Sequence, residues 1–160
     1  MTDVADLIRE AFEENGWQYV ETDKGLIATV QSDRARWIML ASGCSDESTY
    51  VWCRSCTPVR IPEGCRQAVM EYITRANDRM VIGAFELSLD SGELRFRTSL
   101  AFCTDPVTSS MVSDLVQLNV SMMDRYLPGI LSVVYANANP KDAIAAAEAF
   151  ADASEEPQEA

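Results

Sequence analysis

The chain has 160 residues, an ordinary length for one globular domain, and 48% of them are hydrophobic, which is enough for a packed core. Its 25 acidic residues outnumber 13 basic ones and give a net charge of −12, which argues against a surface that attracts nucleic acid or anionic membrane. Histidine is absent, so the chain lacks the most frequent general base, metal ligand and pH switch.

The first half of the chain predicts a helix followed by short strands. Residues 3–15 have apolar side chains at helical spacing and an acidic opposite face, which predicts an amphipathic helix that ends before Gly16. Four β-rich runs follow in two pairs, each pair around a polar turn: residues 17–21 and 26–30, then 36–41 and 49–56.

The second half predicts three helices and one hairpin: a helix over 62–77, strands over 81–89 and 93–102, a long helix over 108–135 and an alanine-rich helix over 141–151. The hairpin alternates apolar and polar residues, so one of its faces is buried and the other is solvated. On the solvated face, Arg95 and Arg97 are expected to pair with Glu86 across the strands rather than to meet an acidic client. Pro128 predicts a kink near residues 124–128 or a break into two helices.

Together these elements predict an α+β fold: an antiparallel sheet packed with helices, in the order helix, strands, helix, β-hairpin and long helix. We expect one domain over residues 1–152, because there is no linker or internal repeat, and an acidic, disordered tail over residues 153–160. An acidic N-terminus, the lack of a membrane-length apolar run and an odd number of cysteines, five, predict a cytoplasmic protein.

The early strands are apolar on both faces: Trp37 and Met39 alternate with Ile38 and Leu40, and Tyr50 and Trp52 alternate with Val51 and Cys53. Such strands usually lie at the centre of a covered sheet, but an exposed groove or dimer face gives the same pattern. The long helix, a second copy of the chain or a bound peptide could cover the second face. Methionines of the long helix either pack in the core or adapt to a partner. The candidate partner-binding residues are Trp37, Met39, Tyr50, Trp52, Met122 and Met123.

The cysteines offer an alternative function. Cys44, Cys53, Cys56 and Cys65 form C-x8-C-x2-C-x8-C, which is compatible with a zinc site or a redox pair. Structural zinc sites usually need two closely spaced pairs, and Cys53 and Cys56 of a regular strand would point to opposite faces. Small buried core residues are therefore the favoured interpretation, and Cys103 is expected to end a strand. We expect no catalytic residue, no metal and no cofactor.

The long helix carries a recognisable motif. Asp124-Arg125-Tyr126-Leu127-Pro128-Gly129-Ile130, followed by the helix that Asn139-Pro140 begins, resembles the C-terminal signature of the YbjN family of bacterial sensory transduction regulators, and residues 85–97 are similar to that family too. The motif covers residues 124–144, and the order of elements extends the resemblance to nearly the whole chain. The resemblance implies a fold like that of type III secretion chaperones, which are small acidic α+β proteins, often dimeric, that hold an extended segment of a client. The cysteine-rich strands depart from the family pattern.

The sequence therefore predicts a non-enzymatic, chaperone-like regulator of the YbjN type that acts as a homodimer and binds another protein chain, but neither nucleic acid nor membrane. A cysteine-based zinc or redox sensor is the alternative, and a structural subunit of a larger complex is a third interpretation. Asp124 and Arg125 are expected to support the proline kink rather than catalysis, because no second titratable group accompanies them in the sequence.

Overall fold

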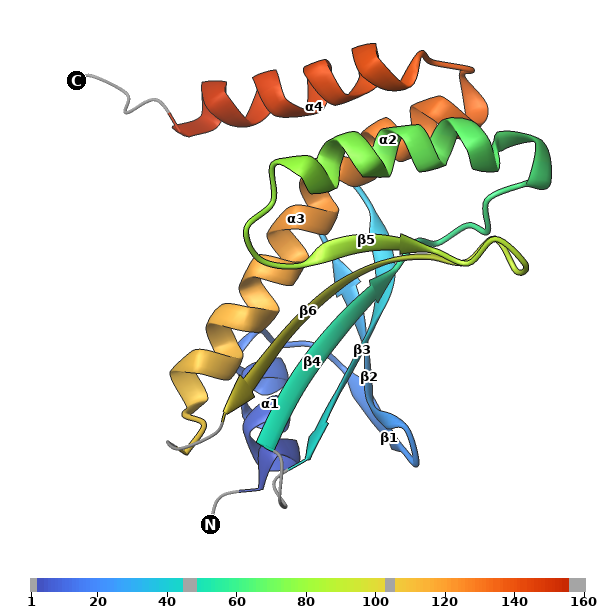
Figure 1. Cartoon of the computed structure of the whole chain (residues 1–160). Coiled ribbons are helices and arrows are strands. Elements are labelled where there is room, and N and C mark those ends of the chain that lie inside the picture. The colour runs from blue at the N-terminus through green and yellow to red at the C-terminus, as the bar shows by residue number, and fades with distance from the viewer. Residues whose placement is uncertain (1–2, 45–48, 103–105, 156–160) are drawn as a thin grey trace.

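The computed structural model describes residues 3–44, 49–102 and 106–155 (Figure 1). Four α-helices and a short 3-10 turn are present in these segments: α1 (Val4–Glu14), η1 (Glu63–Cys65), α2 (Arg66–Asp78), α3 (Ser109–Tyr135) and α4 (Pro140–Glu155). The strands are β1 (Tyr19–Thr22), β2 (Gly25–Gln31), β3 (Arg36–Cys44), β4 (Thr49–Cys56), β5 (Ala84–Leu87) and β6 (Leu94–Phe102). The predicted α+β class and element order are confirmed.

The strands form one antiparallel sheet in the order β1-β2-β3-β4-β6-β5. The long strands β3, β4 and β6 lie side by side at its centre, and the short strands β1 and β5 lie at its edges. The register places Met39 opposite Ser55 and Ser55 opposite Phe96, so these three side chains point to the same face.

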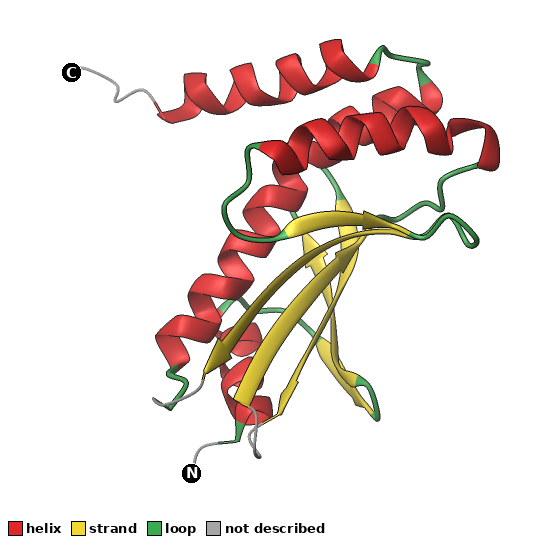
Figure 2. Ribbon diagram, in the orientation of Figure 1, coloured by secondary structure: helices red, strands yellow, loops and turns green. Residues whose placement is uncertain are grey.

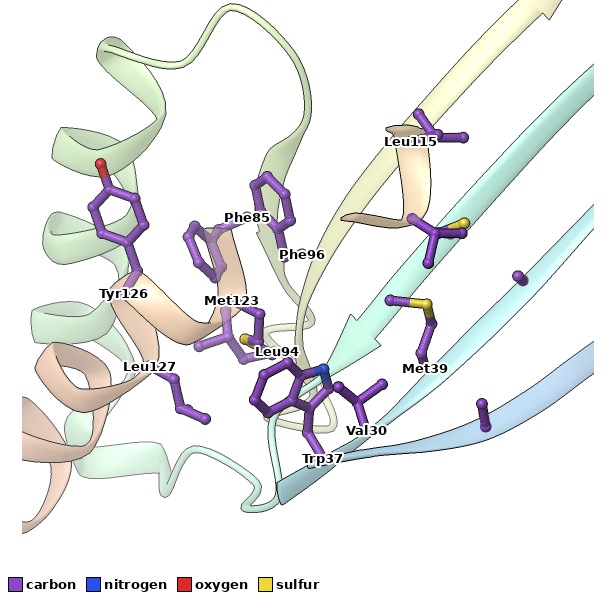
Figure 3. Packing of buried hydrophobic residues seen from close by; sticks show 14 of the residues in the cluster. Val30, Trp37, Met39, Phe85, Leu94, Phe96, Leu115, Met123, Tyr126 and Leu127 are labelled. Atoms are coloured by element: carbon purple, nitrogen blue, oxygen red, sulfur yellow. The ribbon is translucent and has the colours of Figure 1, made fainter. Parts of the chain in front are cut away.

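Within the described residues, helices cover that face only (Figure 2). Helices α1 and α3 pack on the central strands, α2 packs on β5, and α4 packs outside them on α2 and α3. The core between the layers contains large side chains that are fully buried, among them Trp37, Phe12, Phe96 and Met123. Figure 3 shows Trp37 and Met39 pointing from the sheet into this core. Among the described residues, no helix is long and apolar enough to cross a bilayer.

Some element boundaries differ from those that the sequence predicts. Strand β5 begins at Ala84 rather than at residue 81, because Gly83 adopts a φ of +80° and Val81 lies 98% exposed in the preceding bend. Helix α4 continues to Glu155, so residues 153–155 belong to a helix and not to the predicted tail. The remainder of that tail, residues 156–160, and the predicted strand end at Cys103 lie outside the described residues.

The family-like motif of the long helix has a structural role. Helix α3 is continuous through Pro128, and its ribbon bends where it passes behind α2 (Figure 1); the predicted break into two helices is wrong. The Tyr72 hydroxyl of α2 donates a 2.9 Å hydrogen bond to the carbonyl of Tyr126, next to the turn that Pro128 loosens. A Cβ at Gly129 would lie 2.2 Å from that hydroxyl oxygen. Glycine therefore permits the close crossing of α2 and α3, and proline bends the helix at this point.

A buried polar network joins α3 to the middle of the sheet. The side-chain amide of Asn119, which is fully buried, donates to the carbonyls of Cys53 and Phe96 and to Thr98 Oγ1 at 3.1–3.2 Å. Its Oδ1 accepts a 2.6 Å hydrogen bond from Ser55 Oγ, which in turn accepts one of 2.9 Å from Trp37 Nε1. Each polar side chain in this chain of contacts has a partner, so the network fixes the position of α3 on β4 and β6.

Candidate functional site

The second face of the sheet, which we call the open face, has no helix over it in the described part of the chain (Figure 1). One row of side chains crosses it from strand to strand: Val20, Ile27, Leu40, Arg54, Arg97 and Ala84. Two neighbouring rows add Thr29, Ile38, Cys56, Arg95 and Glu86 on one side, and Ser42, Trp52 and Ser99 on the other. Alternation along each strand sets this face, since the intervening residues point into the core.

The half of the open face on β1, β2 and β3 is apolar. Val20 is 60% exposed and Ile38 53% exposed, and the partly buried Ile27 and Leu40 lie between them. A hollow of about 400 Å³ at the end of this half is lined by Thr29, Arg36, Trp37, Ile38, Cys56, Thr57 and Pro58. Aliphatic side chains that are adjacent on exposed strands are typical of an interaction surface.

The half of the open face on β4, β6 and β5 is charged. Arg95 Nε donates a 2.9 Å bond to Glu86, and Arg97 also pairs with Glu86, which confirms the predicted cross-strand ion pairs. Burial acts to raise the pKa of Glu86, but the hydrogen bond from Arg95 and the charge of Arg97 outweigh it, so that this pKa is lowered. The Arg54 guanidinium lies over the Trp52 ring, 4.4 Å from its centroid.

The six predicted partner-binding residues lie in three different places: the open face, the core and a surface beside α3. Tyr50, which is 44% exposed, and the partly buried Trp52 lie on the open face. Trp37, Met39 and Met123 do not belong to a surface: they are at most 2% exposed, because α3 packs over the strand face that the first two occupy. These three residues therefore belong to the core and not, as predicted, to a partner-binding surface.

Met122 belongs to a second apolar surface, which lies beside α3. It lines a hollow of about 370 Å³ together with Arg79, Met80, Val81, Ile82, Leu118, Arg125, Tyr126 and Glu148. A neighbouring hollow of about 410 Å³ is lined in part by Leu100 and Met111, which are 38% and 39% exposed. Of the methionines of α3, Met123 therefore lies in the core, the preceding Met122 is partly buried at the edge of this surface, and Met111 is exposed.

The four candidate cysteine ligands do not lie together. Cys53 is buried on the helix-covered face, and burial raises the pKa of its thiol to about 12. Cys56 lies on the open face, as the alternation predicts, Cys44 ends β3, and Cys65 ends the η1 turn just before α2. Within the described ranges, no group of three or more His, Cys, Asp or Glu side chains is placed to hold a metal ion. A protonated, buried thiol is a poor metal ligand and a poor nucleophile.

Several site features are not apparent from the sequence alone. Arg36 and Arg54 lie on the open face, but single arginines within strands carry no signal of which face they occupy. Asn119 has a recognisable signal, since it is a polar residue within the apolar stripe of α3 that also contains Val112, Val116 and Met123.

The fold and the site together define a small α+β domain with an uncovered, partly apolar sheet face. The chain belongs to the YbjN family: the family model, described as "Putative bacterial sensory transduction regulator", matches residues 5–132. Among solved structures, the chain is similar to the crystal structure of YbjN from E. coli, which is described as "a putative transcription regulator". The two share 12% identity with a TM-score of 0.48, and the match covers 85% of this chain and 95% of that one. No curated protein matches the sequence.

Proposed function

We propose that this chain is a non-enzymatic, chaperone-like regulator of the cytoplasm that binds a segment of another protein on the open face and acts as a homodimer. The observation that carries the proposal is the exposure of Val20, Ile38 and Tyr50 on a sheet face that no described helix covers. Covering these side chains removes apolar surface from water, which favours association by about 25 cal/mol per Å² before the entropic costs of binding.

The charges on the open face indicate which partner fits it. Although the chain has a net charge of −12, the strands present more arginines than acids on this face: Arg36, Arg54, Arg95 and Arg97 against Glu86, with Glu93 just before β6 also paired to Arg95. A segment with apolar residues and some carboxylates would complement both halves of the face. The hollow beside Ile38 is suited to one apolar anchor of such a segment.

Site-directed photo-crosslinking in the native cell tests this proposal. A benzophenone amino acid would replace Ile38 on the open face and, as a matched control, Leu89, which is 55% exposed beyond the end of β5. We expect a defined crosslinked protein from position 38 and none from position 89. Identical products from both positions, or no product from position 38, would contradict binding on the open face.

Sedimentation velocity on the purified chain tests the homodimer. We expect a dimer at micromolar concentration. A crosslink from position 38 to a second copy of the chain would place the dimer contact on the open face, whereas a crosslink to a different protein would identify the client. A chain that sediments as a monomer over the whole concentration range would contradict the homodimer and leave the client test unaffected.

A further inference from the structure

A pocket lies between α3, α4 and the turn that joins β2 to β3, and it is separate from the open face. Its volume is about 590 Å³, which is within the range of about 300–1,000 Å³ for small-molecule sites. It is lined by Arg34, Arg125, Pro128, Gly129, Ser132, Ala143, Ala146 and Ala147. Five of these eight residues are alanine, proline or glycine, so most of the wall is apolar and unobstructed by long side chains.

The shape of the pocket follows from two features of the sequence. On the α3 side, the helix bends at Pro128 and Gly129 has no side chain, so α3 leaves space for the pocket. Helix α4 presents Ala143, Ala146 and Ala147 to the pocket, and these side chains are too short to reach across to α3. Alanine favours the helix strongly, so α4 keeps its form without filling the space.

The charged part of the pocket is cationic. Arg34 and Arg125 bring two guanidinium groups to its lining, and the carboxylate of Asp124 lies 4.0 Å from Arg34 Nε. The lining itself therefore carries two permanent cations and no carboxylate. Arg125 Nε is buried and has no hydrogen-bond partner within the described chain. A buried N–H of a guanidinium that lacks an acceptor costs free energy, and an anionic ligand would remove that cost.

We propose that this pocket binds a small amphiphilic anion: a monocarboxylate with an unbranched alkyl chain of medium length. The carboxylate lies at Arg34 and Arg125, and the alkyl chain lies along Pro128, Gly129 and the alanines of α4. The proposal does not depend on the open face, because the two sites share no lining residue. Bound in this way, the ligand contacts α3 and α4 at once and stabilises their packing.

Isothermal titration calorimetry of the full chain with octanoate tests the proposal. Octan-1-ol and octylammonium are the matched controls, because they keep the alkyl chain and change only the head group. We expect octanoate to bind at least about tenfold more tightly than octan-1-ol, as one charge-assisted contact implies, and octylammonium not to bind. Equal binding of octanoate and octan-1-ol, or no binding of octanoate, would overturn the proposal.

Substitutions in the pocket test where octanoate binds. Ala146→Leu fills the space between the helices and should abolish octanoate binding, whereas Ala145→Leu changes a neighbouring exposed residue of α4 outside the lining and should leave it intact. Leucine is a good helix former, so both variants keep α4, and far-UV circular dichroism checks this. Arg34→Gln should weaken binding about tenfold. Unchanged affinity in Ala146→Leu would show that octanoate binds elsewhere and would refute the assigned site.

Discussion

Replacing Asn119 with alanine should cost this protein a large part of its stability. The side-chain amide shares its two N–H groups among the Cys53 carbonyl, the Phe96 carbonyl and Thr98 Oγ1, and Oδ1 accepts from Ser55 Oγ. These contacts amount to at least two donated bonds and one accepted bond in a site without solvent exposure. At about 1 kcal/mol of net free energy for each bond, Asn119→Ala should lower the free energy of unfolding by about 3 kcal/mol.

Urea denaturation followed by circular dichroism measures this loss, and the dependence of free energy on urea should stay unchanged. For a chain of this length the loss corresponds to a fall of about 6–12 °C in Tm. Ser121→Ala, an exposed position of the same helix, is the control and should change stability by less than about 0.5 kcal/mol. Asn119→Leu keeps the volume without the amide and should lose a similar amount. A loss below about 1 kcal/mol in both Asn119 variants would refute the role of the network.

Three further predictions follow from particular contacts. Gly129→Ala should lower the free energy of unfolding by about 2 kcal/mol, because the new Cβ meets the Tyr72 hydroxyl, although alanine normally stabilises a helix; Tyr72→Phe should recover part of the loss, and a stabilised Gly129→Ala protein would disprove the close crossing. Because the pKa of Glu86 is lowered in the fold, its ion pairs stabilise the protein above the ordinary glutamate pKa and cease to do so as pH falls through the folded value. Glu86→Gln should therefore be less stable than the natural chain by up to about 1 kcal/mol at pH 7, and the difference should shrink below about pH 4.3; a difference that persists in acid would be inconsistent with this account. Cys53, whose buried thiol has a pKa of about 12, should react with iodoacetamide at pH 8 only after unfolding, which peptide mass spectrometry would detect; labelling in the native protein would show that β4 opens.

The local pattern of the sequence was sufficient to predict the four α-helices and the six strands, although not all of their bounds. Helical spacing located α1 and α3, and two-residue alternation located β6, where Phe96 is buried and Arg97 exposed. The pairing of Arg95 and Arg97 with Glu86 followed from the same alternation, because a hairpin places its strands in direct contact.

The sequence alone does not decide which face of the sheet the helices cover, and the reason is physical. In β3, Trp37 and Met39 on one face are no more apolar in character than Ile38 and Leu40 on the other, so alternation alone does not decide which pair meets the helices. The choice depends on α3, which reaches β4 and β6 through Asn119 from far along the chain. Likewise, Arg34 and Ala146 meet at one pocket only because the bend of α3 and the packing of α4 bring them together.

In the described part of the chain, helix α4 packs on other helices and not on the sheet. We therefore expect it to separate from the domain before the rest of the native structure unfolds. It packs on α2 and α3, and among its side chains up to Ala149 only Ala143 and Ile144 are buried. Alanine interfaces bury little apolar area, so α4 can detach at a free energy well below that of global unfolding. The amide protons of α4 should therefore exchange with solvent through a local opening. The amide protons of β3 and β4 should exchange only when the whole domain unfolds. We therefore expect the C-terminal helix to open as a cooperative unit of its own, apart from the rest of the domain.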